Sequence, residues 1–261
     1  DLHSSVRRQR QMCIRDSPYA QRDRKTTVLE GAILGSMFFE PSTRTRISFG
    51  SAFNLLGGHV RETTGFESTA IAKGESLYDT ARVLSGYSDA IVMRHPTAGS
   101  VNEFASASRV PVINGGDGAN EHPSQALLDL YTIRSELAGR RRGIDGLRIA
   151  MVGDLRFGRT VHSLSRLLTR FKNVSVSLVS PAELKMPGEL VDEMRQTGID
   201  VVETDQLELG IANVDIVYST RIQEERFESQ ADADLYRGRF RLNRSIYTAL
   251  CEPNTAVSYT H

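Results

Sequence analysis

Apolar runs of strand length alternate with segments of helical periodicity along most of this chain. The apolar runs predict strands at residues 32–39, 89–94, 110–115, 147–153, 174–180, 199–204 and 214–220. Between them, apolar side chains recur three and four residues apart, as at Ala126, Leu130 and Ile133, which predicts amphipathic helices. Strands that alternate with helices favour an α/β protein whose sheets are mostly parallel and flanked by helices.

One stretch interrupts the alternation and divides the chain. Residues 139–146, "GRRRGIDG", combine glycines with charge and continue neither pattern. With 261 residues, the chain is long enough for two domains that each bury a core. We therefore expect one domain at residues 18–138 and a second at residues 147–257.

The two ends of the chain differ from the rest. Residues 1–17 have no useful periodicity, and "QMCIRDS" within them resembles translated adaptor sequence, as does "VSYTH" at the other end. A disordered native tail is the alternative. We therefore expect residues 1–17 and 258–261 to be non-native or disordered ends.

The composition narrows the class of protein. Hydrophobic residues make up 39% of the chain and charged residues 25%, which is typical of a soluble globular protein. The 32 basic residues balance 32 acidic ones, so nothing favours nucleic acid or an anionic membrane as a partner, and any anion site must be local. No apolar run approaches the roughly 20 residues that span a bilayer. Cys13 and Cys251 offer neither a disulfide framework nor metal-ligand spacing, and a cytoplasmic location is expected.

"PSTRTR", residues 41–46, follows the first predicted strand and opens an amphipathic segment that ends at Gly57 and Gly58. Ser42 suits the N-cap of this helix. Free N–H groups at a helix N-terminus, together with hydroxyls and a guanidinium, form a site for phosphate. The alternative is a capped helix with solvated arginines, although capping needs Ser42 alone. The glycine and lysine pattern of a nucleotide-binding P-loop is absent.

Two further motifs follow strands in the first half of the chain. "MRHP" puts Arg94 at the end of a buried run, where a guanidinium needs an anion, a carbonyl or water. "GGDGANEHPSQ" ends with His122, a proline suited to the first helical turn, and Gln125. His122 and Gln125 are three residues apart and can share one face, although a lone histidine is more often structural than catalytic.

The second half carries two similar motifs. "GDLRFGRTVHS" joins a strand to a helix and contains Arg159, but it lacks the glycine pattern of dinucleotide binding. "STRIQEER" places Arg221 and Gln223 beyond another strand. Lys73 lies apart from both, in the small-residue segment 68–76. Taken singly, each of the three is better explained as a solvated surface turn.

Five predicted strands end in motifs rich in Arg, His, Gln, Ser or Thr. Ligands of open α/β sheets bind beyond the carboxyl ends of the strands. One polar strand end is ordinary, but five on the same edge imply a cleft for an anionic substrate. The cluster in "PSTRTR" makes phosphate the expected anion.

Taken together, the motifs resemble those of the aspartate/ornithine carbamoyltransferase family. "FFEPSTRTRISF", "MRHP", "DGANEHPSQALLDLYT", "GDLRFGRTVHSL" and "STRIQEER" stand in the family's order, and the resemblance covers residues 18–257. The first motif is specific to the family, and the last two select its aspartate branch. An ornithine enzyme would carry a cysteine-containing signature for its second substrate, and this sequence has none.

The resemblance implies a carbamoyl-phosphate domain followed by an aspartate domain, with the active site in the cleft between them. It implies transfer of the carbamoyl group from carbamoyl phosphate to L-aspartate, giving N-carbamoyl-L-aspartate and phosphate, an early step of pyrimidine synthesis. No metal, cofactor or covalent nucleophile is required, which agrees with the absence of such motifs. A carbamoyltransferase for another amine, such as ornithine, and a non-catalytic anion-binding or regulatory module are the alternatives.

The family's motifs also imply roles for the matching side chains. Those expected to bind carbamoyl phosphate are Ser42, Thr43, Arg44, Thr45, Arg94, His122 and Gln125. Among these, the residues implied to act on the carbamoyl group itself are Thr45, Arg94, His122 and Gln125. Those expected to bind the aspartate carboxylates are Arg159, Arg221 and Gln223. Lys73, with Thr69 nearby, would reach into the site of a neighbouring subunit of a homotrimer. The resemblance also implies a regulatory chain as a further partner.

The sequence departs from the family pattern at its ends. The family pattern has "HPLPR" and a closing helical segment soon after a strand resembling "NTAV", whereas "SYTH" follows here. Most of the expected first helix is also absent. We therefore expect the chain as printed to be truncated at both ends, poorly soluble and inactive, because apolar faces would lack their cover.

Overall fold

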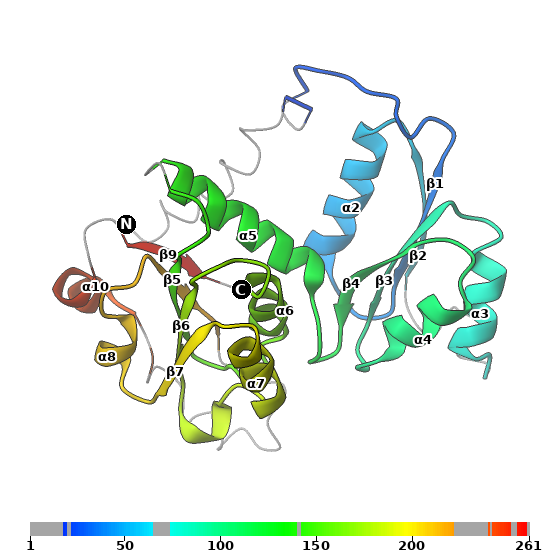
Figure 1. The fold of residues 1–261 in the computed structure, drawn as a ribbon. Helices are drawn as coiled ribbons and strands as arrows, with labels where there is room; N and C mark the ends of the chain where they lie inside the picture. The colour runs from blue at the N-terminus through cyan, green and yellow to red at the C-terminus, as the bar shows by residue number, and fades with distance from the viewer. Residues whose placement is uncertain are drawn as a thin grey trace. The chain divides into compact units, whose positions relative to one another are not determined.

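The computed structural model describes residues 18–19, 22–64, 74–139, 142–221, 240, 242–251 and 255–259. They form two compact units, one within residues 8–124 and the other within residues 125–261 (Figure 1). Each unit is built on one parallel sheet with helices against it. The predicted fold class, two α/β domains with parallel sheets, is confirmed.

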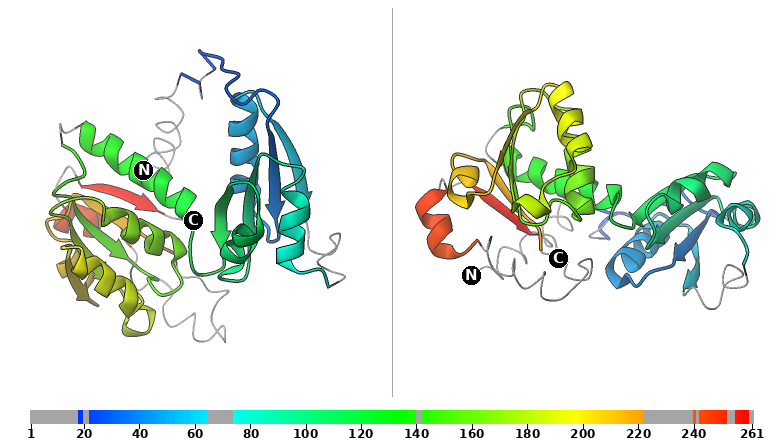
Figure 2. Two further views of the ribbon diagram at one scale, coloured as in Figure 1. Left: turned by 45° about the vertical axis from the view of Figure 1, so that its right-hand side comes forward. Right: turned by 90° about the horizontal axis from the view of Figure 1, so that it is seen from below.

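The first unit has a four-stranded sheet in the order β2-β1-β3-β4, and all its strand pairs are parallel. The strands are β1 (Ile33–Phe38), β2 (His59–Thr64), β3 (Ala90–His95) and β4 (Val112–Asp117). The helices are α2 (Thr43–Leu55), α3 (Leu77–Leu84) and α4 (Ser100–Ala107). Successive strand residues face opposite sides, so α2 packs on one face of the sheet while α3 and α4 pack on the other (Figure 2).

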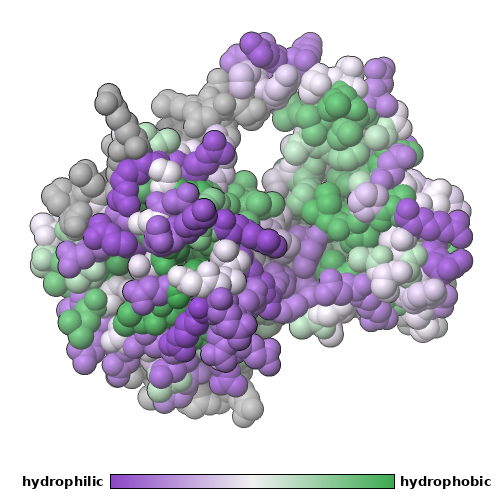
Figure 3. Space-filling view, viewed as in Figure 1, coloured by the Kyte–Doolittle hydropathy of each residue, from purple (hydrophilic) through white to green (hydrophobic). Residues whose placement is uncertain are grey.

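Helix α2 is apolar on more than one side. Phe49 and Phe53 pack against Leu34, Phe38 and Val92 of the sheet. On the side away from the sheet, Ile47 is 55% exposed and Leu55 is 37% exposed. Figure 3 shows apolar side chains gathered over this helix on the visible face of the first unit. The helix therefore carries an exposed apolar surface beside its packed one.

The second unit has a five-stranded parallel sheet in the order β7-β6-β5-β8-β9. The strands are β5 (Arg148–Val152), β6 (Ser175–Val179), β7 (Asp200–Thr204), β8 (Ile216–Ser219) and β9 (Ala256–Tyr259). The helices are α5 (Pro123–Ala138), α6 (Arg159–Leu168), η2 (Ala182–Leu184), α7 (Gly188–Gln196), α8 (Leu207–Ile211) and α10 (Arg244–Leu250).

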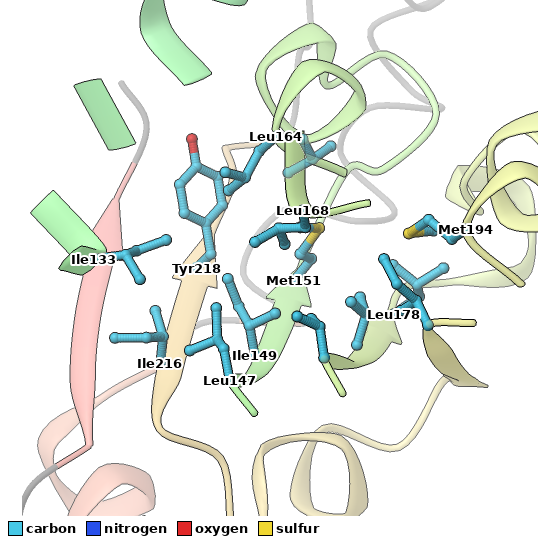
Figure 4. Packing of buried hydrophobic residues seen from close by; sticks show 14 of the residues in the cluster. Ile133, Leu147, Ile149, Met151, Leu164, Leu168, Leu178, Met194, Ile216 and Tyr218 are labelled. Carbon is cyan, nitrogen blue, oxygen red and sulfur yellow. The ribbon is translucent and has the colours of Figure 1, made fainter. Parts of the chain in front are cut away.

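The main core of the second unit lies between one face of this sheet and helices α5, α6 and α7. Tyr218 is fully buried there, and Figure 4 shows its ring beside Ile133 and Leu164 with the hydroxyl directed away from Leu147 and Ile149. Helices α8 and α10 cover the opposite face. The central strands β5 and β8 are therefore buried on both faces, as is usual in a parallel sheet, whereas the edge strand β7 is largely exposed.

All seven predicted strands are present, with ends displaced by up to two residues. The strand predicted at residues 110–115 ends later than expected, because β4 continues through Gly115 to Asp117. A side chain at Gly115 would lie 3.3 Å from the Met93 carbonyl oxygen, so glycine here permits a close approach between β3 and β4. Strand β2 was not predicted, because "HVRETT" is largely polar; it lies at the margin of its sheet, where polar residues are tolerated.

The expectation for the C-terminal end was partly wrong. Ser258 and Tyr259 belong to β9 and pair with Tyr218 and Ser219 of β8, so backbone pairing extends the strand beyond Val257. Residues 1–17 and 260–261 lie outside the described residues.

The division of the chain into two compact units falls between Ser124 and Gln125, at the start of α5, whereas the predicted first domain extends to residue 138. The observed and predicted boundaries differ by almost the entire length of α5. Ala126, Ile133 and Leu137 lie in the core of the second unit, so their burial joins α5 to that unit. The predicted helical face at Ala126, Leu130 and Ile133 is confirmed.

No helix among the described residues is long and apolar enough to cross a membrane.

Candidate active site

Three of the predicted motifs meet at the carboxyl end of the first sheet. Parallel pairing places Phe38 of β1 opposite Arg94 of β3, and the Phe39 amide donates to the Arg94 carbonyl oxygen at 2.9 Å. "PSTRTR" therefore begins beside Arg94. His122 follows the end of β4, the next strand along the sheet.

Arg94 is half-buried and contacts three groups of the first unit. Its Nε donates to Glu40 Oε1 at 2.5 Å, which forms an ion pair. Its Nη1 lies 3.5 Å from the Gly115 carbonyl oxygen and 3.4 Å from Nε2 of His122. The Glu40 contact fixes the plane of the guanidinium, since charge-assisted hydrogen bonds are strong and directional. The structure therefore brings together Arg94 and His122, two of the predicted site residues.

His122 is buried between Arg94 and Ser124. Its Nδ1 lies 3.3 Å from Ser124 Oγ. A guanidinium has no acceptor, so the Arg94 contact fits a neutral ring whose Nε2 accepts and whose proton is on Nδ1. With a neutral His122 ring, the positive charge of this pair at the carboxyl end of the first sheet is carried by Arg94.

The N-terminus of α2 has the features of an anion site. Ser42 occupies the predicted N-cap position, but within the described residues its side chain makes no capping hydrogen bond. Thr43 and Arg44 are exposed, and the first turn contains no acidic residue. The amides of this turn and the adjacent hydroxyls are therefore arranged without a built-in negative charge, as a site for an external anion requires.

Two predicted motifs lie at the ends of neighbouring strands in the second unit. Arg159 is the first residue of α6, after β5, and Arg221 follows β8 by two residues. Thr220 Oγ1 donates to the carbonyl oxygens of Val152 and Asp154, at 3.1 and 3.2 Å, and so joins the two junctions. Arg159 is half-buried and Arg221 is exposed.

Gln125 lies in the first turn of α5 and is held by a buried carboxylate. Its Nε2 donates to Asp129 Oδ1 at 3.1 Å, and the Tyr218 hydroxyl donates to Asp129 Oδ2 at 2.5 Å. Burial raises the pKa of Asp129 to about 6, although the hydrogen bonds from Tyr218 and Gln125 act to lower it. Burial also raises the pKa of Tyr218 well above its usual value, so this hydroxyl is a neutral donor.

The expectation that five polar strand ends share one edge was wrong, because three belong to the first sheet and two to the second. Thr69, Lys73 and Gln223 lie outside the described residues. Among the described residues, no group of three or more His, Cys, Asp or Glu side chains could hold a metal ion.

Four residues that hold the site, Glu40, Asp129, Tyr218 and Thr220, were not predicted from the sequence. Asp129 left a readable signal, because it lies on the buried face of α5 with Ala126 and Ile133, where a carboxylate needs partners. Glu40 immediately precedes "PSTRTR", but its ion pair with Arg94 joins residues 54 positions apart. Such a pair follows only from strand pairing.

Comparison with known proteins matches each half of the chain to a domain of the same protein family. The family model for the aspartate/ornithine carbamoyltransferase carbamoyl-P binding domain matches residues 6–135. The model for the Asp/Orn binding domain of the same family matches residues 145–257. This chain belongs to the aspartate/ornithine carbamoyltransferase family.

The chain is similar in sequence to aspartate carbamoyltransferase catalytic subunits from bacteria and archaea. It is 71% identical over 242 residues to the aspartate carbamoyltransferase catalytic subunit of Cellvibrio japonicus, covering 93% of this chain and 72% of that protein. It is 48% identical over 221 residues to the catalytic subunit of the same name from Methanocaldococcus jannaschii, covering 85% of this chain and 71% of that one.

Solved structures of aspartate transcarbamoylases share the carbamoyltransferase fold. The Trypanosoma cruzi enzyme, in complex with carbamoyl phosphate and aspartate, matches with a TM-score of 0.81 and 37% identity, over 92% of this chain and 76% of that one. The catalytic subunit from M. jannaschii matches with a TM-score of 0.78 and 40% identity, over 99% of this chain and 80% of that one. This chain therefore shares with these structures a fold of two domains, each with a parallel sheet flanked by helices.

Proposed function

We propose that this protein transfers the carbamoyl group of carbamoyl phosphate to L-aspartate, giving N-carbamoyl-L-aspartate and phosphate. The observation that carries the proposal is the contact between Arg94 and His122 beside the N-terminus of α2. The named relatives are aspartate carbamoyltransferase catalytic subunits, and a similar solved enzyme holds carbamoyl phosphate and aspartate. We place the reaction in cytoplasmic pyrimidine synthesis.

In this proposal the phosphate binds at the start of α2. Ser42, Thr43 and Thr45 supply hydroxyls and Arg44 supplies a guanidinium, while the first-turn amides add a partial positive charge. Support comes from the exposure of Thr43 and Arg44 and from the absence of an acidic residue in that turn. Phosphate is the leaving group, so stabilising its charge lowers the barrier to its departure.

The carbamoyl group is proposed to lie against Arg94, His122, Thr45 and Gln125. The aspartate amine attacks the carbamoyl carbon, its electron pair forms the C–N bond, and negative charge builds on the carbonyl oxygen. Arg94, His122 and Thr45 stabilise that charge, and Gln125 binds the carbamoyl NH₂. The C–O bond to phosphate then breaks, and the departing phosphate takes the proton that the amine loses. Fixed orientation of the two substrates supplies much of the remaining rate.

The aspartate carboxylates are proposed to bind Arg159, Arg221 and Gln223. Arg159 and Arg221 follow neighbouring strands of the second sheet, and Thr220 holds their junctions together. Two arginines fit two carboxylates, because each guanidinium can bind a carboxylate through paired hydrogen bonds.

We also propose a homotrimer in which Lys73, with Thr69 nearby, completes the site of a neighbouring subunit. Its support is the family resemblance of the segment around Lys73. A regulatory chain is a further proposed partner, and its support is the family resemblance of the chain as a whole.

The experiment that tests the proposal measures formation of carbamoyl-aspartate, with ornithine as the competing amine. It uses a purified version of the protein to which the family's first helix, its "HPLPR" segment and its closing helix are added, and all variants described for kinetics carry the same additions. Binding of carbamoyl phosphate is measured separately by calorimetry. Carbamoylation of aspartate alone is the expected result. Carbamoylation of ornithine instead would assign another member of the family, and absence of carbamoyl-phosphate binding would reject the site at α2.

A further inference from the structure

A buried chain of hydrogen bonds links Gln125 to the aspartate half of the proposed site. It runs from Gln125 on α5 through Asp129 to Tyr218 on β8, and the Thr160 side chain on α6 also hydrogen-bonds to Tyr218. Thr160 directly follows Arg159, and Tyr218 precedes Arg221 by three residues. The mechanism given above uses neither Asp129 nor Tyr218.

This series of hydrogen bonds decides which end of the Gln125 amide, the NH₂ or the oxygen, is turned toward Asp129. An ionised carboxylate has acceptors only, so it can be paired with the NH₂ end of the amide but not with the oxygen. With Nε2 bound to Asp129 Oδ1 at 3.1 Å, the Gln125 Oε1 remains as an acceptor. The NH₂ of a carbamoyl group is a donor and needs an acceptor of this kind.

We propose that Asp129 is a positioning residue that holds the Gln125 amide with Oε1 available to the carbamoyl NH₂, and that Tyr218 holds Asp129. This inference rests on the proposed function. Gln125 and Asp129 are one helical turn apart, so they share a face of α5. Tyr218 is fixed by its ring in the core, which makes its hydroxyl a rigid donor to Oδ2 (Figure 4).

Protonation of Asp129 would weaken its preference for one orientation of the Gln125 amide. A neutral carboxyl can donate to the amide oxygen, so it no longer excludes the reversed orientation, in which the NH₂ of Gln125 would meet the NH₂ of the substrate. The described groups that act on the Asp129 pKa besides burial are Tyr218 from β8 and Gln125 from α5, while Thr160 of α6 acts on Tyr218. Because the pKa of Asp129 is about 6, activity should fall below that pH.

A double-mutant cycle on the full chain tests whether Asp129 acts through Gln125. We expect Asp129→Asn to lower kcat/KM about tenfold, and Gln125→Ala to lower it by a similar or larger factor. In the Gln125→Ala background, Asp129→Asn should have less than about a twofold further effect, since residues acting as a unit are not additive. The same cycle is measured on the Kd for carbamoyl phosphate, which does not require turnover.

The matched control is Asp215→Asn, a second buried carboxylate of the same unit. Asp215 accepts hydrogen bonds from Arg142 and Arg148 and makes no described contact with Gln125. It should lower stability and leave kcat/KM of the folded fraction within about twofold.

A second measurement covers the case in which Asp129→Asn does not fold. Tyr218→Phe keeps the ring and removes the donor that favours the ionised carboxylate, so the acid limb of the kcat/KM profile should move up by about one pH unit. A merely structural tyrosine would leave the limb in place.

Equal effects of Asp129→Asn in both backgrounds, or an unmoved limb in Tyr218→Phe, would overturn the positioning role and leave the proposed function intact. Wild-type activity in Gln125→Ala, or no binding of carbamoyl phosphate by the wild type, would instead reject the proposed site and this inference with it.

Discussion

The two arginines of the proposed carbamoyl-phosphate site differ in how firmly they are held. Arg44 is exposed in the first turn of α2, whereas Arg94 is half-buried and paired with Glu40. An exposed guanidinium is free to move onto a ligand, but it contributes little to folding. A paired one is already oriented before the ligand arrives.

Arg44→Ala should impair catalysis without affecting stability. Losing a donor to the departing phosphate should cost about 2–4 kcal/mol of transition-state stabilisation, by analogy with oxyanion donors. The measurements are kcat/KM and the urea midpoint, with Arg82→Ala, at an exposed position in the last turn of α3, as the control. Unchanged kcat/KM would remove Arg44 from the site.

Glu40→Ala should affect stability directly. It removes the charged partner 2.5 Å from the half-buried Arg94 guanidinium, and losing one partner of a hydrogen-bonded charged pair costs about 1–3 kcal/mol. Urea unfolding measures the loss, with the exposed Glu30→Ala as control. If both variants unfold at the same urea concentration, the ion pair contributes nothing to folding.

Asp129 predicts a pH dependence of stability. Its pKa of about 6 in the folded chain lies above the ordinary value of 3.8, so the folded state binds the proton more tightly than the unfolded state. Asp129 therefore contributes to the free energy of unfolding fully at low pH. This contribution falls by about 3 kcal/mol in all as the pH rises from about 4 to above 6. The measurement is the difference in free energy of unfolding between wild type and Asp129→Asn across this range, and a difference independent of pH would contradict it.

The ends of the neighbouring strands β5 and β8 come into close backbone contact. Gly153 follows β5 with a φ of +114°, and a side chain there would lie 2.7 Å from the Thr220 carbonyl oxygen. The same Thr220 bonds the turn through its hydroxyl. Only glycine satisfies both the backbone angle and the contact. The spacing of the two junctions that carry Arg159 and Arg221 therefore depends on a residue without a side chain.

Gly153→Ala should separate these two junctions. We expect a loss of about 2–4 kcal/mol of stability, from backbone strain and overpacking together, and a raised KM for aspartate with less change for carbamoyl phosphate. Gly188→Ala is the control, because that glycine begins α7 with nothing within 4 Å of an added side chain. Equal KM values for aspartate in the wild type and Gly153→Ala would show that the contact does not position the arginines.

The whole molecule is proposed to act as a homotrimer with shared sites. If Lys73 and Arg94 serve one site from two subunits, then mixing Lys73→Ala chains with Arg94→Ala chains should restore part of the lost activity, because some sites receive both intact residues. Native mass spectrometry confirms that mixed assemblies formed. Mixed assemblies as inactive as either parent would rule out sharing through these two residues.

The sequence by itself determined the fold class, seven of the described strands and the polar motifs that follow five of them. These features depend on local periodicity and on side chains close together in the chain, which is why Ser42 at the N-cap of α2 and the buried face of α5 were predicted. Polar β2 and the last residues of β9 were not predicted, because pairing with β1 and β8 defines them.

Only the tertiary structure decided which motifs meet and what holds them. Strand order divided the polar ends between two sheets, and burial joined α5 to the second unit. The contacts of Arg94 with Glu40 and of Asp129 with Tyr218 join residues 54 and 89 positions apart. Periodicity carries no information about such distant pairs, because sheet register and core packing bring them together.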